Sequence, residues 1–319
     1  MWLIKSEEDT DLQYGKLPND RTLEELINSS IIIVDKHSGP TSHQVTAWIR
    51  DIFNVKNCGH SGTLDPAVTG VLPVALGNAT KAMPVLTGID KEYIGVMHLH
   101  KEVPENILRN VISEKFIGKI KQRPPVKSAV ARVEREREIY FFDILEIVGK
   151  DILFKVGCEA GTYIRKLCHD IGQALKVGAH MSELRRTKVG DFTEGKSHSL
   201  VEIRDAYEFW KGNNDEANLR KILIPVEYAT MHVKRVFVKD SAVDALCNGS
   251  PLYPKGITRI QKDIIRGETI AIMTLKEELI ALGISKMTSE EMLNRKTGTA
   301  VRIDRVLMPR GTYQKWEKA

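Results

Sequence analysis

Cysteine is scarce in this chain, and no two cysteines lie at the spacing of a metal knuckle. The 319 residues include four cysteines, namely Cys58, Cys158, Cys168 and Cys247. A structural zinc site usually draws on cysteines separated by about two to four residues. Cys168 is followed by His169, but Cys168 falls on the apolar stripe of an expected helix, where a small buried thiol is typical. We therefore expect reduced cysteines and no structural metal.

Long apolar runs and a strong excess of one charge are also missing. No stretch approaches the roughly 18 apolar residues of a membrane span. The first eight residues contain acids where a signal peptide needs a basic and then an apolar segment. These features predict a cytoplasmic protein with no membrane partner. The 47 basic and 42 acidic residues leave a net charge of +5, which permits a nucleic-acid partner without requiring one.

The patterning predicts an α+β protein with three parts. We expect an N-terminal arm over residues 1–20, flexible or clasping, a large domain over 21–230 and a small domain over 231–319. In the large domain, Thr22–Glu25 is a capping box and Ser42 is the expected cap of a striped helix. Strands are expected at 31–34, 92–99, 128–133, 138–148 and 152–158, with helices after Pro104 and Thr162. Runs of strands with intervening helices favour a mostly antiparallel sheet.

The small domain is expected to be β-barrel-like. Short strand signals at 233–238, 269–275, 278–282 and 300–308 are separated by glycines and prolines. Asp240 is an expected cap of a short helix, and Thr288–Glu291 reads as a second capping box.

The most specific segment of the chain runs from Gly59 to Leu72 and holds one carboxylate, Asp65, between glycines. Pro66 biases Asp65 toward extended dihedral angles, since the proline ring crowds the preceding residue. Gly62 and its neighbouring glycines permit turns and close approaches. From these residues alone, Asp65 is either a nucleophile or the cap of a following helix.

This segment resembles the catalytic loop of the TruB/dyskerin family of RNA pseudouridine synthases, Gly-His-(Ser/Thr)-Gly-x-Leu-Asp-Pro. The passage from Asp35 to His43 resembles the first motif of the family and departs from it at His37, where a proline is usual. Residues 240–243, 267–272 and 308–310 resemble a PUA domain, an RNA-binding module. The whole run is similar to archaeal dyskerin homologues. The resemblance implies a pseudouridine synthase fold, with a mixed, mostly antiparallel sheet flanked by helices, and a C-terminal PUA domain.

The resemblance also implies roles for three catalytic residues. Asp65 acts at the target nucleotide, Arg165 pairs with Asp65, and Tyr93 stacks on the extruded base and takes part in proton removal. Without the resemblance, Tyr93 is an ordinary strand aromatic and Arg165 a solvated charge. The chemistry is apt, since a guanidinium can orient a partly buried carboxylate through two hydrogen bonds and keep it ionised. A phenol ring can hold a base by stacking, at about 1–3 kcal/mol.

Further residues are expected around the substrate. His60 is expected to order the loop or contact RNA, Tyr163 to pack in the pocket, and Leu184 to form an apolar wall beside the uracil, although a strand leucine is a core residue by default. Four cations of the small domain are expected to bind RNA: Lys255, Arg259, Lys262 and Arg266. Duplex RNA is recognised largely through its shape and backbone, to which basic side chains are suited.

Isomerising uridine to pseudouridine needs no redox or energy input, so no cofactor and no metal are expected. Three functions remain open. The first is an H/ACA guide-RNA-dependent synthase acting on rRNA, and on tRNA as well in some homologues. Its implied partners are the guide RNA, Nop10-like and Gar1-like small proteins, and a kink-turn-binding ribosomal-protein homologue joined through the RNA. The second is a stand-alone synthase acting on the T-arm uridine of tRNA. The third is a non-catalytic RNA-binding scaffold.

Overall fold

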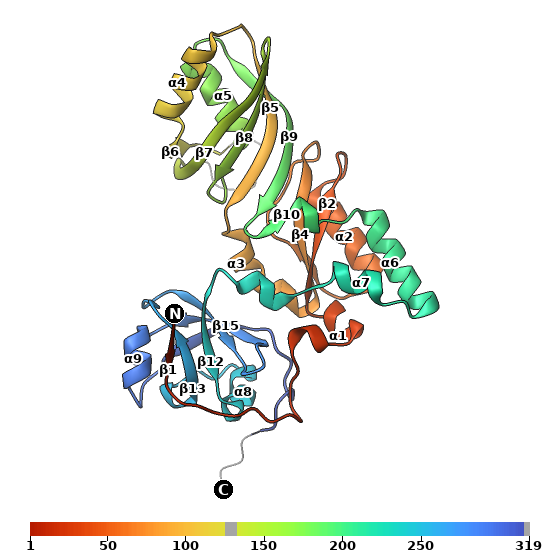
Figure 1. Ribbon diagram of the computed structural model, residues 1–319, viewed down its shortest axis with the longest axis vertical. Coiled ribbons are helices and arrows are strands. Elements are labelled where there is room, and N and C mark those ends of the chain that lie inside the picture. Colours follow the sequence, from red (N-terminus) through yellow and green to blue (C-terminus); the bar gives the residue numbers. More distant parts are fainter. Residues whose placement is uncertain (125–132, 316–319) are drawn as a thin grey trace.

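Two β-sheets organise the chain, as the computed structural model shows for residues 1–124 and 133–315 (Figure 1). The larger sheet has ten strands in the order β11-β2-β4-β9-β5-β8-β7-β6, with β10 on β9 and β3 on β4. Its strands are β2 (Ser30–Lys36), β3 (Cys58–His60), β4 (Thr69–Leu76), β5 (Lys91–Leu99), β6 (Gly118–Gln122), β7 (Arg135–Val148), β8 (Asp151–Cys158), β9 (Ala179–Val189), β10 (Phe192–Thr193) and β11 (Ile224–Pro225). Residues 128–132 of the strand expected at 128–133 lie outside the described residues.

Strand β9 joins two halves of this sheet. It pairs in parallel with β4 on one side and antiparallel with β5 on the other. The other neighbouring pairs in this sheet are antiparallel, as expected. Residues near Arg186 on β9 therefore face both the strand that follows the Asp65 loop and the strand that carries Tyr93.

Helices cover the large sheet. They are α1 (Leu23–Ile27), α2 (Ser42–Phe53), α3 (Met83–Thr87), α4 (Glu105–Lys115), α5 (Ile164–Ala174), α6 (Leu200–Asn213) and α7 (Ala217–Ile222). The capping box at Thr22–Glu25 is confirmed. Ser42 as the cap of α2 is wrong: Thr41 accepts the capping hydrogen bond from the Gln44 N–H, and Ser42 is the first helical residue. The Ser42 hydroxyl is therefore released for another contact.

The smaller sheet has the order β1-β13-β12-β14-β15-β16. Its strands are β1 (Trp2–Ile4), β12 (Lys234–Val238), β13 (Ile257–Gln261), β14 (Thr269–Met273), β15 (Leu279–Ser285) and β16 (Val301–Val306), with helices α8 (Asp240–Cys247) and α9 (Ser289–Asn294). The N-terminal arm thus supplies an edge strand to the C-terminal sheet. Asp240 does not cap α8, because Lys239 is the cap residue and the Asp240 carboxylate instead binds Thr10 and the Asp11 N–H. The capping box at Thr288–Glu291 is confirmed.

A shared apolar cluster holds the two sheets together. It contains Ile31 and Val71 of the large sheet and Phe237 and Met273 of the small sheet. Beside it, Arg21 donates two hydrogen bonds to the buried Glu227, which also accepts the Leu279 N–H. No helix in residues 1–124 and 133–315 is long and apolar enough to cross a membrane.

Candidate active site

Asp65 lies in the loop between β3 and β4. Asp65 begins a turn that contains Pro66 and is closed by the Val68 N–H, which donates to the Asp65 carbonyl at 3.0 Å; the chain then enters β4. Asp65 therefore precedes a strand, and the helix-cap alternative is wrong. Gly62 and Gly70 have φ of +109° and +101°, values that favour glycine. The glycines set the loop conformation, and Asp65 stands out from it with its side chain 57% exposed.

Two buried side chains hold the backbone on either side of Asp65. The Ser42 hydroxyl accepts from the Leu64 N–H at 2.8 Å and donates to the Leu64 carbonyl at 3.1 Å. The Lys36 ammonium donates to the carbonyl oxygens of His37, Pro66 and Val68 at 3.0, 3.0 and 2.8 Å. Both side chains are completely buried. The first motif, expected to support the fold, thus braces the Asp65 loop directly.

Arg165 reaches Asp65 from the first turn of α5. Its Nη2 lies 3.0 Å from Asp65 Oδ2, and the two side chains are 58% and 57% exposed. The expected pair was partly buried and bidentate, whereas the structure shows a single contact in an open position. The carboxylate and guanidinium therefore stand where a nucleotide can approach both.

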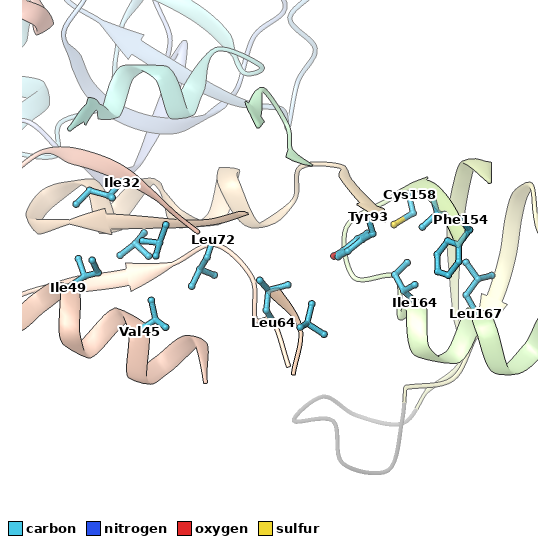
Figure 2. Close-up of a cluster of buried hydrophobic side chains, with 14 of the residues drawn as sticks. Ile32, Val45, Ile49, Leu64, Leu72, Tyr93, Phe154, Cys158, Ile164 and Leu167 are labelled. Atoms are coloured by element: carbon cyan, nitrogen blue, oxygen red, sulfur yellow. The ribbon is translucent and has the colours of Figure 1, made fainter. Parts of the chain in front are cut away.

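Tyr93 is 9% exposed and lies on β5 directly opposite Arg186 of β9. Burial raises the pKa of the Tyr93 phenol, and the charge of Arg186 and a hydrogen bond with it act in the opposite direction. In Figure 2 the Tyr93 hydroxyl points away from Cys158, toward the half of the core that contains Leu64. The phenol thus faces the loop side of the site.

Leu184 lies on the same face of β9 as Arg186, two positions away. It is opposite Gly95 of β5, and a Cβ added at Gly95 would come within 2.9 Å of Leu184 Cδ1. Leu184 is half-buried and packs against the large core. It can therefore serve both as a core residue and as an apolar wall near Tyr93.

His60 and Tyr163 flank the site. The half-buried His60 ring packs edge-on against His43, with centroids 4.9 Å apart. Burial, aided by the charges of His43 and Arg186, lowers the pKa of His60 to about 4, so its imidazole is neutral at pH 7. Tyr163 precedes α5, where its N–H donates to Gln122 Oε1 at 2.9 Å and its carbonyl accepts from Gln122 Nε2 at 3.2 Å. The buried Gln122 thereby fixes the chain just before Arg165.

Sequence reasoning missed three buried cations around the site: Lys36, Lys91 and Arg186, which are 0%, 6% and 1% exposed. Across the described ranges, none of the three forms an ion pair with a carboxylate, and each donates to backbone carbonyls. The sequence feature that could have revealed them is a basic residue that ends or interrupts an apolar strand pattern, as Lys36 does after Ile-Ile-Ile-Val-Asp. Among residues 1–124 and 133–315, no cluster of metal-ligating side chains is present.

The four cations expected to bind RNA lie in the small domain, far along the chain from Asp65, and Arg259 is the one on a strand, β13. Lys255 is exposed, and Lys262 is half-buried beside β1. The Arg259 guanidinium lies 4.2 Å from the Phe237 ring centroid, and Arg266 pairs with Glu291. Within residues 1–124 and 133–315, the side chains of Lys255 and Lys262 form no hydrogen bond or ion pair, whereas Arg259 and Arg266 contact protein groups.

Comparison with family models gives the class of protein. Residues 50–164 match the TruB family pseudouridylate synthase N-terminal domain, and residues 165–230 the tRNA pseudouridylate synthase B C-terminal domain. Residues 234–307 match the PUA domain and residues 1–46 the DKCLD domain. The chain belongs to the TruB family of pseudouridine synthases, and its activity is that of an isomerase.

Relatives and solved structures that match nearly the whole chain show which members of the family are similar to it in length and sequence. A probable tRNA pseudouridine synthase B of Methanopyrus kandleri is 51% identical over 98% of this chain and 92% of the relative. The Methanocaldococcus jannaschii protein of the same description is 49% identical over 99% and 94%. Among solved structures, a chain of a Cbf5-Nop10-Gar1 complex matches with a TM-score of 0.94 and 49% identity, covering 99% of this chain and 96% of that one. A chain of an H/ACA RNP bound to a substrate RNA containing 2'-deoxyuridine matches with a TM-score of 0.92, 48% identity and the same coverage.

Proposed function

We propose that this protein converts uridine to pseudouridine in rRNA as the catalytic subunit of an H/ACA guide-RNA particle. The observation that carries the chemistry is the exposed Asp65, braced by Ser42 and Lys36 and contacted by Arg165 at 3.0 Å. The two H/ACA structures support the particle, since they match almost the full length of this chain. A non-catalytic RNA-binding scaffold would have no use for the four side chains that correspond to the catalytic motifs of the family. They are Asp65, Tyr93, Tyr163 and Arg165, and we therefore do not favour the scaffold function.

The reaction breaks the bond between ribose C1′ and uracil N1, turns the base and joins C1′ to C5. C5 then loses its proton and N1 gains one, so no atom is lost overall. The target nucleotide must leave its stack to reach the site, which costs a few kcal/mol. Asp65 acts at the nucleotide, with Arg165 holding its carboxylate, and Tyr93 stacks on the base. Leu184 closes the pocket on its apolar side and retains the detached uracil. His60 contributes as a neutral ring that orders the loop.

The remaining surfaces fit the assembly. The PUA domain would hold the lower stem and ACA end of the guide RNA, with Lys255 and Lys262 free for phosphates and Arg259 and Arg266 presented by Phe237 and Glu291. Nop10-like and Gar1-like proteins would bind the protein, and a kink-turn-binding homologue would join through the RNA. We place the particle in the cytoplasm. The two relatives are described as probable tRNA pseudouridine synthases, which favours a second candidate function, modification of tRNA without a guide.

Tritium release from 5-tritiated uridine in a target RNA tests the proposal. The assay compares the full chain with and without guide RNA and partner proteins, and Asp65→Asn with Asp51→Asn, an exposed aspartate on α2 with its own arginine partner. We expect Asp65→Asn to lose at least about 10³-fold in rate with RNA binding little changed, and Asp51→Asn to remain active. An active Asp65→Asn variant would contradict the chemistry. Equal modification of rRNA targets without guide RNA would replace the first function by the second.

A further inference from the structure

Arg186 stands where the two halves of the active site meet. On β9 it is opposite Gly70 of β4 and opposite Tyr93 of β5. The approach to β4 is so close that a Cβ on Gly70 would lie 2.2 Å from the Arg186 carbonyl oxygen. Directly opposite residues on paired strands have Cβ atoms about 4.5–5.5 Å apart. Arg186 is therefore the β9 residue that neighbours both the end of the Asp65 loop and the aromatic residue.

The guanidinium spans the two ends of the Asp65 loop. Arg186 Nε donates to the Val71 carbonyl at 2.7 Å, and Nη2 donates to the Gly62 carbonyl at 3.2 Å. Gly62 precedes Asp65 by three residues, and Val71 follows it on β4. A rigid planar fork that binds both ends limits how far the intervening backbone can open.

The same guanidinium belongs to the residue directly opposite Tyr93 on the paired strand, and its charge acts on the phenol. Both side chains are buried, so solvent screens this interaction little. Because the cation favours the ionised phenol and burial favours the neutral one, Arg186 makes the Tyr93 proton easier to remove than burial alone would allow.

The position is costly for a purely structural residue. Arg186 is 1% exposed and, within the described part of the chain, has no carboxylate partner. Burial lowers its pKa, and the buried Lys36 and Lys91 lie close enough for like charges to repel. A buried unpaired charge is expensive. A neutral side chain would avoid this cost, so the charge itself calls for a function.

We propose that Arg186 is a positioning residue for the isomerisation, which ties the Asp65 loop to Tyr93 and supplies fixed positive charge beneath the detached base. The inference rests on the proposed function. When the C1′–N1 bond breaks, its electron pair stays on the base, so the uracil is negatively charged until C5 bonds to C1′. C5 then loses its proton and N1 gains one, so the product is an isomer of uridine. A preorganised cation stabilises such charge without reorganising.

Arg186→Gln and Arg186→Lys in the full chain, assembled with guide RNA and partners, test this role. Single-turnover tritium release measures the chemical step, and target-RNA binding is measured separately. We expect Arg186→Gln to lower the rate by about 10²-fold, with RNA affinity within about threefold of the parent protein. Its rate should recover partly as pH rises, because the phenol without its cation ionises only at higher pH. Arg186→Lys should be intermediate, since it keeps the charge and loses the fork.

Arg235→Gln provides the matched control, because Arg235 is a half-buried strand arginine of the small sheet. The Arg235→Gln variant should lose stability but keep the single-turnover rate of the parent protein. A folded Arg186→Gln protein with the parent rate overturns the inference. So does a loss that is the same at every pH and as large for lysine as for glutamine, since that outcome leaves only a structural role.

Unfolding measurements test the link between Arg186 and Tyr93 independently of the proposed pseudouridine synthase activity. If Arg186 binds the Tyr93 hydroxyl, Tyr93→Phe should destabilise the protein, and by less when Arg186 is already glutamine or lysine. Equal effects in both backgrounds, or no destabilisation by Tyr93→Phe, overturn the link even if the Arg186→Gln variant does not fold well. A parent protein that makes no pseudouridine overturns the proposed function, whatever the coupling between these two residues.

Discussion

Replacing Ser42 by alanine should damage catalysis more than it damages the helix to which Ser42 belongs. The Ser42 hydroxyl is completely buried, and both of its hydrogen bonds go to the backbone of Leu64, the residue before Asp65. Alanine leaves the Leu64 N–H and carbonyl without this partner. Each buried group left unsatisfied costs about 1–3 kcal/mol, so the free energy of unfolding should fall by roughly 2–6 kcal/mol.

The loss of this anchor should also move Asp65. A displacement on the order of 1 Å can cost about 10²-fold in rate, so we expect single-turnover tritium release to fall by roughly 10- to 100-fold. The measurement belongs at a temperature where circular dichroism shows the variant to be folded. Target-RNA affinity should change little, because Ser42 is buried beneath the loop.

Thr41→Ala is the matched control, one residue away. Thr41 caps α2 by accepting the Gln44 N–H, and among the described residues its hydroxyl bonds only with Gln44. Its loss should cost about 1 kcal/mol of stability and leave the rate near that of the parent protein. A parent-like rate for folded Ser42→Ala would refute the reasoning. Equal rate losses for both variants would assign the effect to α2 instead of the Leu64 anchor.

Two further predictions concern stability. Glu227→Gln should lower the free energy of unfolding by about 3 kcal/mol, toward the lower end of the cost of breaking a buried pair, because Arg21 and Glu227 are only 11% and 8% exposed. Lys16→Gln removes one partner of an exposed ion pair and should cost under about 1 kcal/mol. Both variants are measured by urea unfolding. Similar losses for Glu227→Gln and Lys16→Gln would contradict a buried Arg21–Glu227 pair between the two sheets. For His60, burial lowers the folded-state pKa to about 4 from 6.5. The unfolded chain therefore binds more protons between those values, and stability should rise with pH across that window. His60→Gln should flatten this rise in pH-dependent urea unfolding and His169→Gln, an exposed site, should not; the reverse pattern would be evidence against a buried neutral His60.

The α+β class, the mixed sheet and the C-terminal module could be predicted, because local periodicity and a distinctive loop carry them. The roles of two adjacent hydroxyl residues were harder to predict. Thr41 and Ser42 are both good caps by type, and only the position of Leu64 in space shows that Ser42 is used elsewhere. Strand β13 was missed because glycines and prolines before Ile257 suggested a continuous loop.

The contacts of the site depend on pairings between distant strands. The residues expected at the site included Asp65, Tyr93 and Arg165, and their roles stay predictions. Arg186 became visible as a link only once β9 was known to lie between β4 and β5. Local sequence shows a basic residue in a strand and does not show its neighbours across the sheet. The openness of the Asp65–Arg165 pair was likewise beyond the sequence, since exposure is a property of the folded surface.

The pairing of β1 with β13 has a consequence for synthesis on the ribosome. Trp2 is made long before its partner Gln261, because the whole large domain lies between the two in the sequence. At roughly 5–20 residues per second, the N-terminal strand waits many seconds without its sheet. The large domain can form in that interval, whereas the small sheet gains its edge strand only once β13 has been made. A nascent chain that stalls before residue 257 would leave its own beginning unpaired.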